Sequence, residues 1–229
     1  MKQLFLSFAV ILAAAVSLTS CMDDKGPNTV YYTNIVTFQK NIPSYMVFEY
    51  QKINDSPLIE LQARGQMDTK ALPEGGRCLI TYSYADKEQQ GGSGIINLNM
   101  VQHCYTDTVE SATDIPEVFS LPYVTSALQR SGTWLNLYCR TGYVEKFFGR
   151  KFDIRVDAAT INDEYPQLYL STSVAEGTEV GAATNTYVSV NIQPVWSLAT
   201  CKGVDVHVYA SGPTSESTFR FEKSDSSQQ

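Results

Sequence analysis

Apolar and polar residues alternate along most of this chain, and apolar residues at helical spacing are scarce. In residues 151–157, Phe152, Ile154 and Val156 point to one side of an extended chain, and charged residues occupy the positions between them. Residues 204–210 repeat the pattern with a valine at every second position from 204 to 208. One apolar and one polar face per strand is typical of an antiparallel sheet that is wet on one side. The pattern therefore predicts an all-β protein.

The amino-terminal half contains five such segments, separated by turn residues such as those of Gly91–Gly94. Five strands within residues 31–105 suit a small closed barrel, and the five-stranded OB-fold has this strand count. We therefore expect a five-stranded OB-like barrel domain over these residues. Its strands are predicted at residues 31–39, 45–52, 58–63, 77–85 and 94–103.

The carboxy-terminal half alternates more regularly and predicts an antiparallel β-sandwich over residues 132–223. Between the two halves, residues 106–131 are polar and contain two prolines, so we expect an interdomain connection there, with one or two helical turns at 124–130. The polar residues 224–229 are expected to form a disordered tail. The sandwich strands are predicted at residues 134–139, 151–157, 167–172, 186–193, 204–210 and 218–222.

Residues 1–20 have the layout of a secretory signal, with Lys2 followed by an apolar run over 4–16. The run is shorter than the roughly 20 residues that a membrane-spanning helix needs. It is followed by Leu18-Thr19-Ser20-Cys21, which resembles the lipobox of bacterial lipoproteins, whose cysteine is acylated. Acyl chains contribute about 0.8 kcal/mol per buried methylene, so two or three of them hold a soluble domain to a membrane. We therefore expect a lipid on Cys21.

Residues 21–30 are polar, contain glycine and proline, and predict a flexible tether. Directly after Cys21, the acidic pair Asp23–Asp24 resembles the surface-export signal of Bacteroidetes lipoproteins. Two aspartates that merely solvate the tether are the alternative. The expected location is therefore the outer membrane, with the periplasmic and the exposed side both open.

Charge restricts the partners of the domains. Without residues 1–20 the chain has 16 basic and 24 acidic residues, a formal net charge of −8. Such a chain without a basic stripe is a poor partner for phosphate backbones, so we expect no binding to nucleic acid.

Four cysteines remain if Cys21 carries lipid, an even number in an oxidising compartment. Keeping each pair within one predicted domain favours the disulfides Cys78–Cys104 and Cys139–Cys201 among the three possible pairings. Four free buried thiols that behave as small apolar residues are the alternative.

The sequence offers no recognisable catalytic arrangement. Its two histidines, His103 and His207, fall in different predicted domains, and no G-x-S-x-G motif marks a nucleophile. Asp205 and His207 share a strand face, for which we favour a hydrated outer sheet surface. Zinc ligand spacings are absent from the sequence, and we expect no metal site, no cofactor and no enzymatic activity.

Two further positions are candidate sites. Tyr143, Phe147 and Phe148 fall between two predicted strands, where exposed aromatic residues suggest binding to a partner. Strands also favour aromatic residues, so a purely structural role is the alternative. Asp107-Thr108-Val109 resembles the acceptor motif for O-glycosylation in Bacteroidetes, with Thr108 as the acceptor.

A lipoprotein-type amino terminus, a small barrel and a sandwich in this order resemble the NigD-like lipoproteins of Bacteroidetes. The resemblance implies an amino-terminal OB-type domain, a carboxy-terminal β-sandwich and a place in the cell envelope. It implies no reaction and supplies no functional residues. The segments that carry it are "LPEGGRCLITYSYADK", "GIINLNMVQ", "GTWLNLYCRTGY", "KFDIRVDA" and "PQLYLSTSV".

These observations favour a membrane-anchored lipoprotein that acts as a non-enzymatic binding or assembly module for a protein, a peptide or a glycan. A bacteriocin-associated immunity or envelope-protection factor is the alternative that the family name suggests. A glycan hydrolase that depends on two carboxylates ranks third, because it requires a cleft with a close carboxyl pair.

Overall fold

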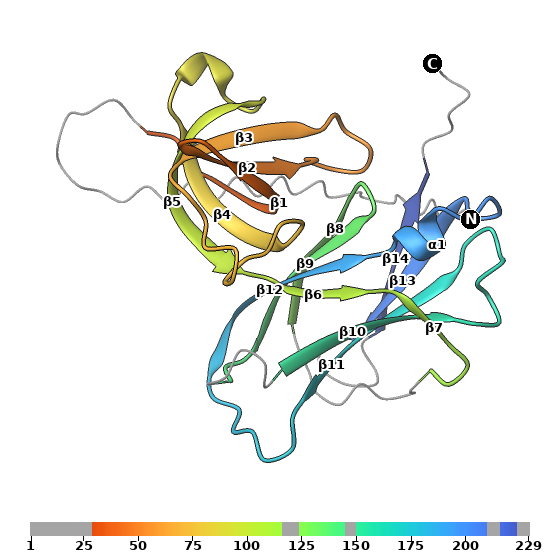
Figure 1. Ribbon diagram of the computed structural model, residues 1–229. Coiled ribbons are helices and arrows are strands. Elements are labelled where there is room, and N and C mark those ends of the chain that lie inside the picture. The colour runs from red at the N-terminus through yellow and green to blue at the C-terminus, as the bar shows by residue number, and fades with distance from the viewer. Residues whose placement is uncertain (1–28, 116–123, 145–149, 210–215, 224–229) are drawn as a thin grey trace, which may run out of the picture.

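The structure is a computed structural model, and it describes residues 29–115, 124–144, 150–209 and 216–223. Figure 1 shows two β-domains that lie side by side, a small barrel and a sandwich of two sheets. The all-β class, the barrel and the sandwich are therefore confirmed. Within these residues no helix is long and apolar enough to cross a membrane.

The barrel is closed and has the strand order β1-β2-β3-β5-β4. The first half of β1 pairs with β4 and its second half pairs with β2. A register shift between Phe38 and Lys40 marks the changeover, as β-bulges commonly do where a barrel strand bends. The five strands are β1 (Tyr32–Ile42), β2 (Tyr45–Tyr50), β3 (Ile59–Arg64), β4 (Arg77–Tyr84) and β5 (Gly94–His103).

Large side chains fill the barrel, among them Phe38, Phe48, Leu61 and Tyr82, all fully buried. Strand β4 differs from its neighbours because residues on both of its faces are buried. One face lines the barrel core and the other is covered by the sandwich, which explains why its sequence does not alternate.

The sandwich consists of a five-stranded sheet, β14-β13-β11-β10-β7, and a four-stranded sheet, β6-β12-β9-β8. It is not purely antiparallel, because β6, β7 and β13 pair in parallel with β12, β10 and β11. Its strands are β6 (Tyr105–Thr108), β7 (Glu110–Ala112), β8 (Val124–Ser131), β9 (Trp134–Gly142), β10 (Arg150–Asp157), β11 (Gln167–Val174), β12 (Ala183–Asn191), β13 (Gly203–Tyr209) and β14 (Glu216–Glu222), with the short helix α1 (Gln193–Trp196) after β12.

The prediction of an interdomain connection over residues 106–131 is corrected where the structure describes it. The chain leaves the barrel in β5 and enters the sandwich in β6, with only Cys104 between them. At buried Val109 it crosses from β6 in one sheet to β7 in the other. Residues 124–130, expected to be helical, belong to strand β8 and pair with β9. Pairing with a long neighbouring strand has overridden the local helical preference of this segment.

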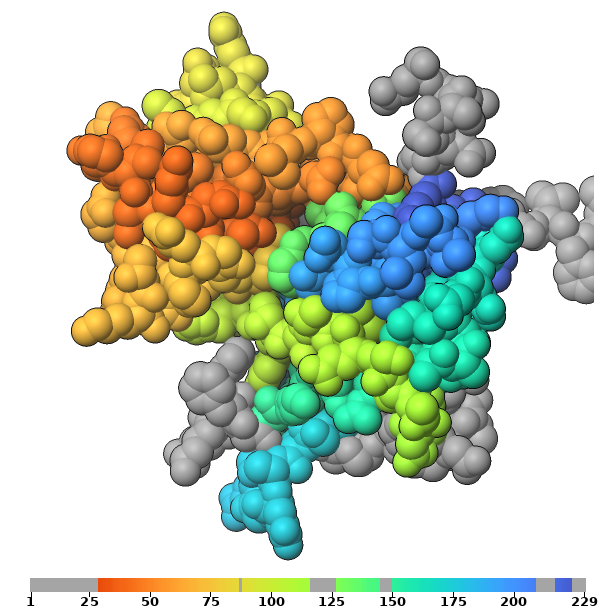
Figure 2. All heavy atoms as spheres, turned by 45° about the vertical axis from the view of Figure 1, so that its right-hand side comes forward, coloured from red at the N-terminus to blue at the C-terminus, as the bar shows by residue number. Residues whose placement is uncertain are grey.

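Figure 2 shows the barrel, in red to yellow, in contact with the green and blue segments of the sandwich. No linker separates the two domains along the chain. The residues at this contact surface therefore determine how firmly the domains are held together.

Candidate functional site

The barrel and the sandwich are joined by Arg130, a fully buried arginine near the end of β8. Its Nη1 and Nη2 donate to the two carboxylate oxygens of Asp55 at 2.8 and 2.7 Å, and Nη1 also donates to the carbonyl of Gly132 at 2.8 Å. The guanidinium lies 4.3 Å from the ring centroid of Trp196. A bidentate pair fixes orientation as well as distance. Arg130 therefore holds the barrel loop that contains Asp55 against the sandwich.

Backbone hydrogen bonds extend the joint around Arg130. The Asn54 amide donates to the carbonyl of Arg130, and the Gly132 amide donates to the carbonyl of Asn54, both at 2.7 Å. The hydroxyl of Ser131 donates to the carbonyl of Gln51 at 2.6 Å. Gly132 has a φ of 59°, and a Cβ at this position would overlap Oε1 of Gln51. The turn between β8 and β9 therefore favours glycine where it meets the barrel.

A second buried arginine, Arg77 at the start of β4, reaches from the barrel into the sandwich. Its three nitrogens donate to Ser189, Asn136 and Thr37, each at 2.9 Å, and its guanidinium lies 4.8 Å from the ring centroid of Trp134. All three acceptors are neutral. Burial therefore lowers the pKa of Arg77 to about 10, which still leaves it charged at neutral pH.

A small apolar cluster completes the contact between the domains. Ile35, Leu79 and Cys104 from the barrel side pack against Tyr138 and Tyr187 of the sandwich. The two tyrosine rings meet edge to face with their centroids 5.7 Å apart. The two arginine clusters and this apolar cluster fix the domains relative to each other.

The joint leaves a cleft of about 380 Å³ between the domains. Both tryptophans of the chain, Trp134 and Trp196, line it from the sandwich side. The barrel contributes an aromatic ring, an exposed aliphatic side chain and several amide and carboxylate groups. These barrel residues include Gln39, Glu49, Tyr50, Gln51, Asp55 and Leu58. Pockets that combine apolar walls with a few convergent polar groups, at a domain interface, are common binding sites.

The cleft contains two carboxylates, Glu49 and Asp55, which bears on the hydrolase alternative. Asp55 forms a bidentate ion pair with the guanidinium of Arg130. Glu49 accepts a hydrogen bond from Nε2 of Gln39 at 2.6 Å. A glycan hydrolase needs one carboxyl that donates a proton. Asp55 therefore serves the joint between the domains.

Tyr143, one of the predicted binding aromatics, is 53% exposed and lines a second pocket of about 240 Å³. This pocket also contains His103 and the buried Arg150. The other two predicted aromatics, Phe147 and Phe148, lie outside the described residues. A binding role for the three aromatics stays a prediction.

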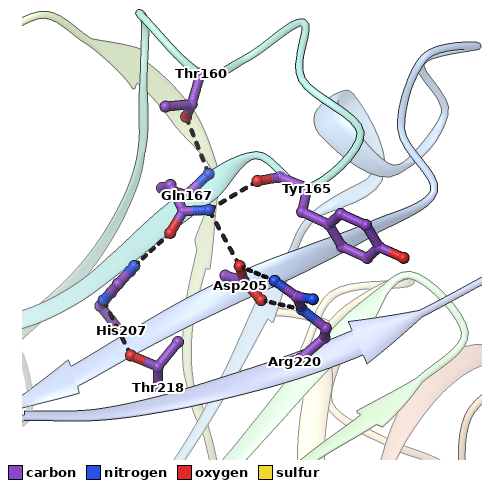
Figure 3. A network of polar contacts seen from close by, with 7 residues as sticks. All are labelled: Thr160, Tyr165, Gln167, Asp205, His207, Thr218 and Arg220. Atoms are coloured by element: carbon purple, nitrogen blue, oxygen red, sulfur yellow. Dashed lines mark hydrogen bonds and ion pairs between the residues drawn. The ribbon is translucent and has the colours of Figure 1, made fainter.

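The outer face of β11, β13 and β14 carries the Asp205 and His207 that the sequence places on one strand face. Figure 3 shows them in a polar network in which Arg220 donates to both carboxylate oxygens of Asp205, each at 2.7 Å. Gln167 donates to Asp205 at 3.2 Å and meets Nε2 of His207 at 2.7 Å. The ring of His207 stacks on Tyr169 at 4.5 Å. Oγ1 of Thr218 lies 3.3 Å from Nδ1 of His207. The expectation of a hydrated outer surface is wrong for Asp205, which is only 7% exposed because its partners cover it.

The four internal cysteines are free, buried thiols, so the structure does not contain the disulfides Cys78–Cys104 and Cys139–Cys201. Cys78 faces the barrel core, whereas Cys104 belongs to the cluster between the domains. Cys139 and Cys201 each donate to a backbone carbonyl instead of to each other. Burial raises the pKa of Cys78, Cys104 and Cys139 to about 12, which keeps these thiols protonated and unreactive.

Of the two predicted modification sites, Thr108 lies within the described residues and Cys21 does not. Thr108 is exposed on the edge strand β6, next to buried Val109, and its glycosylation stays a prediction. Cys21 lies outside the described residues. In the described part of the chain, no group of three or more His, Cys, Asp and Glu side chains could hold a metal ion.

Sequence reasoning missed the buried arginines of the joint and the cleft beside them. The one available signal was the apolar run of residues 78–80 after Arg77, because three successive apolar residues indicate burial on both faces of a strand. The spacing of the two tryptophans gave no sign of the cleft, because they lie 62 positions apart in the sequence and only the fold brings them to one cleft.

Together the fold and the joint define a class of all-β proteins in which a small closed barrel is fixed to a mixed β-sandwich. The chain is similar in fold to a protein of unknown function from Bacteroides vulgatus, with a TM-score of 0.61 and 16% identity over 86% of this chain and 92% of that one. It is also similar to a NigD-like immunity protein from Bacteroides caccae, with a TM-score of 0.59 and 13% identity over 87% and 99% of the two chains. A candidate lipoprotein from Bacteroides fragilis has a TM-score of 0.59 and 11% identity over 85% and 98%.

At these identities the likeness concerns the fold alone, and the fold implied by the resemblance to NigD-like lipoproteins is confirmed. No family model matches the sequence, and no curated protein matches it.

Proposed function

We propose that this protein is a lipoprotein of the cell envelope, anchored to the outer membrane through Cys21, and that it binds a ligand in the cleft between its domains without transforming it. The observation that carries the proposal is the cleft itself, which is lined by Trp134, the largely buried Trp196, and amide and carboxylate groups of the barrel. The likeness of fold to a candidate lipoprotein supports the place in the envelope.

The chemistry of the cleft favours a glycan among the three expected ligand classes. Aromatic rings offer flat apolar surfaces, while Gln39, Glu49 and Gln51 offer donors and acceptors for hydroxyl groups. Leu58 adds an exposed apolar side chain to the wall. An extended peptide or a protein loop would use the same rings and is the outcome to be distinguished.

Binding is tested with residues 28–229 on a glycan and peptide array, followed by calorimetry with the best ligand. Leu58→Glu changes the wall of the cleft without touching either buried arginine, and we expect it to weaken binding at least tenfold. Ile53→Glu is the matched control, because Ile53 is equally exposed on the same loop but does not line the cleft. Equal effects of the two variants, or no signal from any ligand class, would contradict the proposal.

The anchor is tested separately by mass spectrometry of the protein extracted from cell membranes. We expect an amino-terminal fragment that begins at Cys21 and carries acyl chains. A chain that retains residues 1–20, or an unmodified Cys21, would exclude the lipid anchor.

A second candidate function is protection against a bacteriocin, which the likeness of fold to a NigD-like immunity protein favours. In this case the occupant of the cleft is a peptide toxin. Deletion of the gene should then increase sensitivity to the cognate bacteriocin, and Leu58→Glu should not restore resistance. Unchanged sensitivity after deletion would exclude this function and leave the glycan-binding proposal intact.

A further inference from the structure

The second pocket contains a buried cation whose charge the described residues do not balance. Arg150 begins β10 and is only 4% exposed. Its Nη2 donates to the carbonyl of Gly142 at 2.8 Å, and its Nη1 donates to Oγ1 of Thr172 at 3.2 Å. Its Nε is buried and has no hydrogen-bond partner among the described residues. Both acceptors are neutral, and none of the ion pairs among the described residues includes Arg150.

The other two buried arginines of the described chain have different partners. Arg130 forms a bidentate pair with the carboxylate of Asp55, although its Nε, like that of Arg150, lacks a partner among the described residues. Arg77 uses all three of its nitrogens in hydrogen bonds to side chains. Each of them also lies over a tryptophan ring. Both of these arginines join the two domains. Arg150 instead lies within the sandwich, where its bond to the Gly142 carbonyl links β10 to β9 of the opposite sheet. Unlike Arg130, it has no acidic partner among the described residues.

Two ionisable groups lie close enough to Arg150 to affect its pKa, and neither of them neutralises its charge. Its two electrostatic neighbours are the phenol of Tyr105 and the thiol of Cys139, and burial raises the pKa of both groups. Both are therefore protonated and neutral at physiological pH. Burial also lowers the pKa of Arg150 itself, the direction expected for a cation without a counter-ion. A buried charge of this kind costs free energy, which an anion beside it would offset.

The pocket beside Arg150 has room for a small ligand and a rim of suitable chemistry. Its volume of about 240 Å³ lies below the range of about 300–1,000 Å³ for drug-sized ligands, so it suits a single sugar or amino acid. Gln102 and His103 approach it from β5, and Thr184 and Asn185 approach it from β12. Tyr143 is the exposed aromatic residue on the rim. No residue of this pocket belongs to the cleft between the domains.

We propose that this pocket binds a small organic carboxylate and that Arg150 recognises its charge. One guanidinium matches one monovalent carboxylate in charge and in planar shape. A doubly charged phosphate fits less well, because a single cation faces it and the chain without residues 1–20 has a formal net charge of −8. The carboxylate belongs to a uronic acid or to an amino acid, which share this chemistry. The site goes beyond the proposed function, since it does not depend on what occupies the cleft.

The test uses residues 28–229 and measures binding by calorimetry and by the shift in melting temperature. The probes are glucuronate and N-acetylalanine as carboxylates, glucose as the neutral sugar, and inorganic phosphate. We expect saturable binding of a carboxylate, stabilisation that rises with its concentration, and no response to glucose. Stronger binding of glucuronate assigns the site to an acidic sugar, and stronger binding of N-acetylalanine assigns it to an amino acid. Equal responses to glucose and glucuronate, or tighter binding of phosphate than of either carboxylate, would overturn the proposal.

Two variants identify the residue that carries the charge recognition. Arg150→Gln should weaken carboxylate binding at least tenfold, which corresponds to about 1.4 kcal/mol. Because a buried change can impair folding, Thr184→Glu provides a second route, since it places a carboxylate of the chain itself on the exposed rim. It should abolish binding of the added carboxylate without lowering the melting temperature, whereas the matched control Thr184→Gln should bind normally. Unchanged carboxylate affinity in both Arg150→Gln and Thr184→Glu would contradict the role of Arg150.

Discussion

Two arginine–aspartate pairs in this protein share a bidentate geometry and differ in their surroundings. In the pair between the domains, the Arg130 side chain is fully buried and Asp55 is 45% exposed. In the pair on the outer sheet face, the burial is reversed, with Arg220 54% exposed and Asp205 9% exposed. The first pair connects two domains, and the second connects neighbouring strands of one sheet. We therefore expect the two pairs to contribute differently to stability. Removing Asp55 leaves a buried cation, whereas removing Asp205 leaves a cation that water can reach.

The largest effect is expected from Asp55→Asn, which leaves the guanidinium of Arg130 buried without its anion. We expect the free energy of unfolding to fall by about 2–4 kcal/mol, because a buried charge loses its partner. Urea denaturation of residues 28–229, followed by tryptophan fluorescence, measures the change at the joint, where both tryptophans lie. If Asp55→Asn lowered the free energy of unfolding by no more than Asp205→Asn, the burial of Arg130 would not determine the strength of its ion pair.

A smaller loss is expected from Asn136→Ala, at the other arginine of the joint. Oδ1 of Asn136 accepts hydrogen bonds from both Arg77 and Ser189. Its removal leaves a donor of a buried cation unsatisfied, which costs about 2 kcal/mol. Gln129→Ala is the surface control, because Gln129 is exposed on the adjacent strand β8 and pairs with Asn136 in register. Equal stability of the two variants would remove Arg77 from the account of the joint.

Gly132→Ala is expected to cost about 1 kcal/mol, mostly because alanine resists the positive φ of this turn. The Gln51 side chain can move away from the added methyl group, so steric overlap contributes less. Gly177→Ala is the control, since Gly177 also has a positive φ but a Cβ added there would meet no atom within 4 Å. Similar losses of stability in both variants would mean that strain dominates. A much larger loss at Gly132 would show that contact with the barrel contributes as well.

The smallest effect is expected from Asp205→Asn, because the arginine that it leaves behind is open to water. Arg220 lowers the pKa of Asp205 below its ordinary value of 3.8. This carboxylate therefore contributes stability at neutral pH, and the contribution is lost as the pH falls below about 4 and through the lowered pKa. Unfolding curves at pH 7 and pH 3 should differ less for the variant than for the wild type. An equal difference would show that the pair has no net effect on stability.

The alternation of apolar and polar residues predicted most of the fold, because each predicted strand has one face in a core. Residues 151–157 lie in β10 and residues 204–209 lie in β13, with the apolar positions 152, 154, 156, 204, 206 and 208 buried as expected. Strands β6 and β7 were missed because they are short edge strands with mostly exposed polar residues. Their pairing partners lie more than 40 positions away in the sequence, so no local pattern marks them.

The candidate sites were less predictable than the strands. Tyr143 could be singled out because an aromatic residue between two strands is conspicuous, and it does line a pocket. Arg77, Arg130 and Arg150 could not, because a strand arginine is ordinarily a surface residue. Their burial follows from how the domains and sheets pack, which no single strand encodes. The disulfide prediction failed for the same reason, since it assumed that sharing a domain brings two cysteines together.

The most direct test of the central claim compares the two arginine–aspartate pairs by ligand affinity. The claim is that the joint at Arg130 shapes a binding cleft between the domains. Calorimetry with the best array ligand should show at least tenfold weaker binding for Asp55→Asn, and binding within twofold of the wild type for Asp205→Asn. Equal affinities for the two variants would contradict the claim, because the cleft would then not depend on the joint that forms it.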